Sequence, residues 1–156
     1  MGRKSDRRHA FSIIFALSFS FYDDKPSEAD VLNAISYYLD NFAIEGASEI
    51  DYIKNAINGV FAKIEKIDNH IEKTAAAWDI SRIAKADLAI LRLAVYEIFY
   101  DKSIPSSVAI NEAIDLAKEH SSDNSAPFVN GILSKIEKRR KIRKLKVVTA
   151  NENKGI

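Results

Sequence analysis

Cysteine is absent from the sequence, which excludes disulfide bonds and thiolate metal sites. The absence fits a protein of the cytoplasm, where disulfides are rare. The three histidines, His9, His70 and His120, lack the spacing of a metal motif such as HExxH, and no phosphate-binding loop or nucleophile elbow is present. We therefore expect no metal site and no enzyme.

Long apolar runs are also missing. No stretch reaches the roughly 18 uninterrupted apolar residues that a membrane span needs. The apolar segment at residues 11–21 follows a basic start, but serines interrupt it and no small-residue cleavage site comes after it. We expect neither a membrane span nor a signal peptide.

Proline and glycine are scarce, at three and five residues, and little of the sequence alternates with period two. The chain of 156 residues is therefore predicted to form one all-α domain. About seven helices in two small packed bundles would fit, with a division near residue 45 or 78. The predicted helices span residues 5–21, 26–42, 49–67, 71–77, 81–100 and 106–120, and a last helix begins near residue 125.

The helix at 81–100 is apolar around most of its circumference, which predicts a central position. It carries Glu97 among apolar residues. A buried carboxylate needs a cationic partner, and we expect Arg92 or Arg82 to provide it.

Charge is segregated along the chain. Residues 23–123 carry 19 acidic and 10 basic residues, a net of −9, and the two ends together carry a net of +10. Basic ends on an acidic body are a candidate nucleic-acid footprint. The alternative for residues 138–156 is a solvated, partly disordered basic tail, outside a domain that covers residues 1–137.

The stretch VAINEAIDLAKEHSSDNSAPFVNGIL contains residues that a helix disfavours. Gly131 predicts the close approach of another helix or a ligand. Asn111 and Asn130 predict hydrogen bonds at a helix crossing. Phe128 follows a run of turn formers at the start of a helix, where phosphate can bind and a base can stack. The alternative is an ordinary core phenylalanine.

Four blocks, RRHAFSIIFAL, WDISRIAKADLAILRLAVYEI, IPSSVAINEAIDLAKE and PFVNGILSKI, resemble in order and spacing the signature of the NusB family of bacterial transcription antitermination factors. The resemblance covers residues 3–137. It implies an all-α fold without a cofactor, binding to boxA RNA, and a heterodimer with the ribosomal protein NusE. The pair would help RNA polymerase resist termination on ribosomal RNA operons.

The resemblance also implies roles for individual residues. The predicted RNA contacts are Arg3, Lys4, Arg7, Arg8, Lys118 and Phe128. The predicted NusE contacts are Phe15, Ser81 and Asp87.

Some residues depart from the family pattern. Arg8 replaces a common glutamate, Ser121 and Ser122 replace Phe-Gly, and Pro127 replaces a basic residue. The last change removes one expected phosphate contact. Two alternatives therefore stay open: a protein-only adaptor or homodimer with weak RNA binding, and a docking module for a separate RNA-modifying enzyme.

Overall fold

The computed structural model describes residues 3–20, 25–75 and 79–154, and this part of the chain contains seven α-helices, one short 3-10 helix and no strand. The all-α prediction is confirmed. The predicted helical residues 21, 76 and 77 lie outside the described residues. The elements are α1 (Arg3–Ser20), α2 (Glu28–Asn41), α3 (Ala47–Ala62), α4 (Ile64–Ala75), η1 (Ile80–Arg82), α5 (Lys85–Tyr100), α6 (Ser106–His120) and α7 (Ser125–Lys154).

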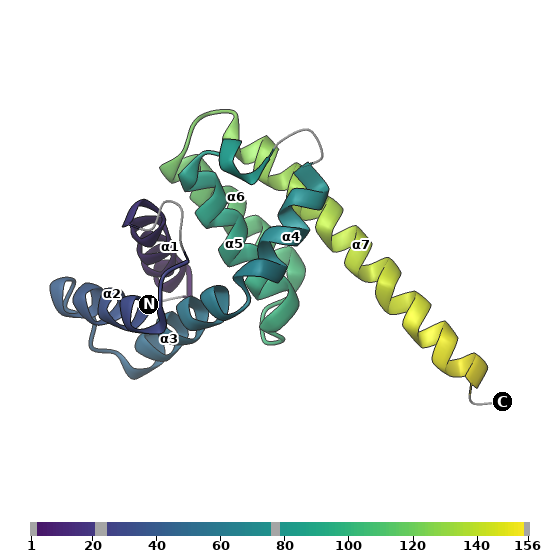
Figure 1. Ribbon diagram of the computed structural model, residues 1–156, viewed down its shortest axis with the longest axis horizontal. Helices are drawn as coiled ribbons and strands as arrows, with labels where there is room; N and C mark the ends of the chain where they lie inside the picture. Colours follow the sequence, from purple (N-terminus) through teal and green to yellow (C-terminus); the bar gives the residue numbers. More distant parts are fainter. Residues whose placement is uncertain (1–2, 21–24, 76–78, 155–156) are drawn as a thin grey trace.

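The helices form two groups that share α5 (Figure 1). Helices α1, α2 and α3 pack on one another, and α4, α6 and α7 pack around α5. Helix α5 also contacts α1 and α3, so it joins the groups, as its apolar circumference predicts. Along the chain, the first group passes into the second at Lys63, between α3 and α4.

The prediction of one helix over residues 49–67 is wrong at its end. Helix α3 stops at Ala62, and α4 begins at Ile64. The apolar periodicity continues across this break, because Val60 and Ile64 are both buried. However, α3 packs on α1 and α2 as well as on α5, whereas α4 packs on α5 and α7. The change of packing partners bends the chain without leaving a mark in the apolar pattern.

The glycine that needs close packing is Gly59, and not Gly131. A Cβ atom on Gly59 would lie 2.2 Å from the Tyr96 ring, whereas one on Gly131 would meet nothing within 4 Å. The predicted close approach of another helix at Gly131 is therefore wrong, and the alternative of a ligand at this position stays a prediction. Asn111 and Asn130 are exposed, and Asn130 bonds to Ser134 of its own helix, so the predicted bonds at a helix crossing are also wrong.

Helix α7 is 30 residues long, and only its first half packs on the body. Its buried residues end at Glu137, Arg139 still bonds to α4, and the helix then projects from the body to Lys154 (Figure 1). Of the segment that the sequence assigns to a partly disordered tail, residues 138–154 are thus helical in the structure. No helix in the described residues is long and apolar enough to cross a membrane.

Candidate nucleic-acid interface

The four cations at the start of α1 fall into two rows, because residues four apart lie on the same face of a helix. Arg3 and Arg7 face α3 and α5. Arg3 pairs with Asp6, and its guanidinium lies 4.5 Å from the centre of the Tyr52 ring. Lys4 and Arg8 face α6 instead. Only the second row is turned toward the region of Lys118.

Lys4 and Arg8 each meet an acidic residue of α6. Lys4 Nζ lies 2.9 Å from Asp115 Oδ2, and Arg8 donates two hydrogen bonds of 2.6 and 2.9 Å to Glu119. These bonds raise the pKa of Lys4 and of Arg8, and the bond from Arg8 lowers the pKa of Glu119. Since all four side chains are more than a third exposed, water screens both pairs. A phosphate group can therefore replace either carboxylate.

Lys118 is exposed on the neighbouring face of α6. It lines a shallow groove between the end of α6 and the start of α7, together with Ser122, Pro127 and Asn130. The structure thus brings three of the six predicted RNA contacts, Lys4, Arg8 and Lys118, to adjacent faces of one surface.

Phe128 is half-buried and packs against the core, and its contact with RNA stays a prediction. The start of α7 is poorer in donors than the sequence suggests. The backbone N–H of Ser125 donates to Ser122, that of Phe128 donates to Asn124, and Pro127 has none. The ring of Phe128, more than the helix terminus, is what this turn can offer to RNA.

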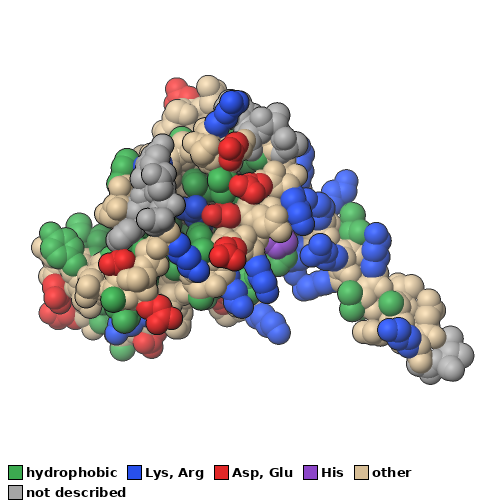
Figure 2. Space-filling model, in the orientation of Figure 1, with side chains coloured by type: hydrophobic (Ala, Val, Ile, Leu, Met, Phe, Trp, Pro, Cys, Tyr) green, Lys and Arg blue, Asp and Glu red, His purple; other side chains and the backbone are tan. Residues whose placement is uncertain are grey.

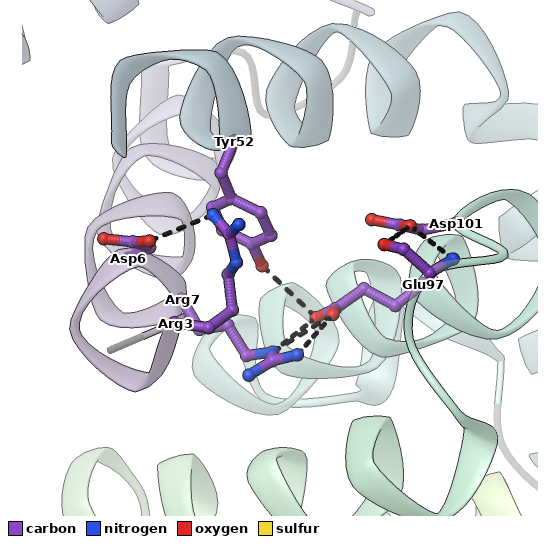
Figure 3. Close-up of polar contacts among 7 residues, drawn as sticks. Arg3, Asp6, Arg7, Tyr52, Glu97 and Asp101 are labelled. Atoms are coloured by element: carbon purple, nitrogen blue, oxygen red, sulfur yellow. Dashed lines mark hydrogen bonds and ion pairs between the residues drawn. The ribbon is translucent and has the colours of Figure 1, made fainter. Parts of the chain in front are cut away.

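Arg7 is not a surface residue. It is 4% exposed and forms a two-pronged ion pair with Glu97 of α5, at 3.0 Å (Figure 3). The Tyr52 hydroxyl donates a third, longer hydrogen bond to Glu97, at 3.4 Å. The predicted partners of Glu97 are wrong: Arg92 pairs with Asp68 of α4, and α1 supplies the guanidinium. Arg7 therefore ties α1 to α5 and is not free to meet phosphate in this structure.

Burial and pairing act in opposite directions on the pKa of Arg7 and on that of Glu97. Burial raises the pKa of Glu97 although Arg7 opposes the rise. Burial lowers the pKa of Arg7, but the hydrogen bond to Glu97 and the charges around the guanidinium, that of Glu97 first, together raise the pKa on balance. The two-pronged geometry is that of an ionised pair, and we assign both groups as charged. Burial next to Glu97 also raises the pKa of Tyr52, which keeps its hydroxyl a donor.

Asp87, a predicted partner contact, is also buried, at 7% exposure. Ser121 Oγ donates to one carboxylate oxygen at 2.6 Å, and Ser125 Oγ donates to the other at 3.1 Å. Ser121 is one of the residues that depart from the family pattern, and its hydroxyl satisfies this buried charge. Asp87 therefore fixes the turn between α6 and α7 that carries Phe128.

The other predicted partner contacts lie nearer the surface. Phe15 is half-buried in a row of aromatic rings, stacked on Phe11 and edge-on to Phe19. Phe19 is 57% exposed, and Lys85 Nζ lies 4.7 Å from the centre of its ring. Ser81 is exposed on η1, shortly before Lys85. Phe19 is not among the contacts predicted from the sequence, although its spacing of four residues from Phe15 places both rings on one face of α1.

Within residues 3–20, 25–75 and 79–154, no group of three or more His, Asp or Glu side chains is placed to hold a metal ion. The site offers cations, hydroxyls and aromatic rings. This chemistry suits binding to a polyanion and to a protein surface.

The model of the NusB family matches residues 4–138. The transcription antitermination protein NusB of Acetivibrio thermocellus is 40% identical over 154 residues, which cover 99% of this chain and 98% of that protein. A solved structure of T. maritima NusB superposes with a TM-score of 0.78 at 31% identity, over 88% of this chain and 92% of that one. A chain from a crystal structure of the antitermination factors NusB and NusE with double-stranded RNA gives 0.76 at 26% identity, over 88% and 96%.

Proposed function

Because the chain belongs to the NusB family, we propose that it binds boxA-type RNA together with a NusE-type ribosomal protein. In this role it would promote processive transcription of ribosomal RNA operons as part of the antitermination complex on RNA polymerase. The observation that carries the proposal is the surface formed by Lys4, Arg8 and Lys118 beside the turn that presents Phe128.

The proposed RNA contact has two parts. Lys4, Arg8 and Lys118 supply the salt-dependent part, since each phosphate contact to single-stranded RNA contributes about 0.7 to the slope of log affinity against log salt. Phe128 supplies a face for one base, which is worth roughly 1–3 kcal/mol. Arg7 and Asp87 act indirectly, because they hold α1 and the α6–α7 turn in place.

The proposed NusE-type contact uses the exposed side of Phe15, Phe19 and Ser81. An aromatic anchor surrounded by polar residues is typical of protein interfaces. Asp87 contributes through the turn that it fixes.

Fluorescence anisotropy of a labelled boxA-like RNA tests the proposal, with and without the NusE-type partner, at two salt concentrations. We expect tighter binding with the partner and weaker binding at high salt. Arg8→Gln and Lys118→Gln should each lower the salt slope by about 0.7. Lys54→Gln, on the exposed side of α3, is the matched control and should leave the slope unchanged.

Phe128→Leu separates stacking from core packing, because leucine keeps an apolar side chain at the core but offers no ring. We expect a loss of about 1–3 kcal/mol in RNA binding with little change in the urea midpoint. Binding no tighter than to a scrambled RNA, even with the partner present, would overturn the proposed function.

One observation favours the alternative of a protein-only adaptor or homodimer. Leu32, Tyr37 and Phe42, in or next to α2, are between 56% and 72% exposed, and exposed apolar patches often mark protein contacts. The homodimer hypothesis predicts that light scattering detects an oligomer of this chain without RNA, and that Tyr37→Ser dissociates this oligomer.

A further inference from the structure

A second basic surface lies on the C-terminal half of α7, beyond residue 138, where the family match ends. Seven of the nine residues at 138–146 are Lys or Arg, and none is acidic. The full helix is about 45 Å long, and this half projects from the body (Figure 1). Figure 2 shows Lys and Arg side chains along it and over its crossing with α4.

These cations differ from those of α1 because most of them lack acidic partners. Arg140 pairs with Glu137. Arg139 donates to the backbone oxygen of His70 and to the Thr74 hydroxyl of α4. Arg143 and Lys146 form no ion pair among the described residues. Their charge is therefore uncompensated at close range.

At the crossing, a groove joins these cations to two aromatic rings. His70 of α4 and Phe99 of α5 are half-buried and stacked, with ring centres 4.3 Å apart and planes 17° apart. Lys73, Arg143 and Lys146 line the same groove. Burial lowers the pKa of His70, and the nearby cations lower it further, so the ring stays neutral. Cations around a half-exposed aromatic floor are the features of single-stranded nucleic-acid sites.

We propose that this groove and the basic half of α7 form a second RNA-binding surface, which takes the sugar-phosphate backbone of single-stranded RNA without reading its sequence. The proposal rests on the proposed function for its choice of RNA as ligand. The surface would hold RNA that flanks the segment bound near Lys4, Arg8 and Lys118.

Two other occupants fit less well. A second copy of the chain would bring like charges together along α7, which opposes association. A membrane-bound helix needs an apolar face opposite a polar one, but the four consecutive cations at residues 138–141 spread over most of the circumference. The aromatic floor also belongs to α4 and α5, which a helix lying on a bilayer would not present.

The test compares two RNAs and two triple variants of the full chain. The RNAs are a short boxA-like element and an oligouridylate of about 20 nucleotides, longer than one typical site. The groove variant combines Lys73→Gln, Arg143→Gln and Lys146→Gln. The control combines three changes of equal charge at other exposed positions, Lys25→Gln, Lys54→Gln and Lys102→Gln.

We expect the groove variant to bind oligouridylate with a salt slope lower by about 2, from three lost contacts at about 0.7 each. A fourfold rise in salt weakens the binding of both proteins, and the factor by which affinity drops should be roughly 20 times smaller for the groove variant than for the wild type. The control should match the wild type, and both variants should bind the short element as the wild type does.

Equal slopes for the groove variant and the control would overturn the second surface while leaving the proposed function intact. Binding of phosphatidylserine vesicles that depends on the groove cations, without any effect on oligouridylate, would also overturn it. Loss of boxA selectivity with the groove effect retained would reject the proposed function alone.

Discussion

Replacing Arg7 with methionine should unfold the protein more easily without acting directly on RNA. The variant keeps a long apolar side chain but leaves the Glu97 carboxylate, which is 1% exposed, without a counter-charge. Removing one partner of a buried ion pair costs about 3–5 kcal/mol. With a urea m-value of about 2 kcal/mol per molar, the midpoint should fall by about 2 M.

Urea unfolding followed by far-ultraviolet circular dichroism measures this loss. Arg8→Met is the matched control, because Arg8 lies one position away in an exposed pair, and its midpoint should stay near that of the wild type. The double variant Arg7→Met, Glu97→Met should recover most of the loss, since apolar side chains can replace a buried ion pair at little cost.

The loss of unfolding free energy in Arg7→Met should depend on pH. Burial holds the pKa of Glu97 above its ordinary value of 4.5, and removal of Arg7 takes away the group that opposes this rise. The folded variant then binds a proton more tightly than the unfolded chain. The stability that comes from this proton is complete below the ordinary pKa and is lost as pH rises through the folded pKa. The difference in stability from the wild type should therefore widen as the pH rises above 4.5, the ordinary pKa of the carboxyl group.

The refuting result is specific. If Arg7→Met unfolds within about 1 kcal/mol of the wild type, and RNA affinity falls as much as in Arg8→Gln, then Arg7 is a surface contact. The buried pair with Glu97 would then not describe the protein in solution.

Three further changes test the packing. Gly131→Ala should stabilise the protein by up to about 1 kcal/mol in thermal unfolding, because the new methyl group meets open space on a helix. Gly59→Ala should destabilise the protein, because the Tyr96 ring must move to make room for the methyl group. The expected cost is about 1–3 kcal/mol from overpacking, reduced by the higher helix propensity of alanine. If Gly59→Ala costs as much in a Tyr96→Ala background, the clash with the ring is not the cause. Asp87→Asn should lower the free energy of unfolding in urea by about 2 kcal/mol, because the neutral amide accepts more weakly from the hydroxyls of Ser121 and Ser125. NusE-type binding should persist in that variant if Asp87 acts only through the turn.

The fold was predictable where the residues of a single helix show its position by themselves. The apolar circumference of residues 85–100 identified α5 as central, and the scarcity of proline and glycine identified the all-α class. The break at Lys63 was not predictable, because the apolar stripe runs on while its packing partner changes. The partner of Glu97 was not predictable either, since Arg7 lies 90 residues away in the chain.

The candidate site also has a part that the sequence identified and a part that only the packing of the helices decided. The family blocks and the basic ends are properties of the sequence, and they identified the family and the candidate RNA residues. Which cations reach solvent is a property of the packed helices. Arg7 and Arg8 are neighbours in the chain, but about 100° separates them around α1. The contact of α1 with α5 turns Arg7 inward to Glu97, and the contact with α6 leaves Arg8 outside. The sequence alone supplied both charges, and only the rotation of α1 against its neighbours decided which one faces solvent.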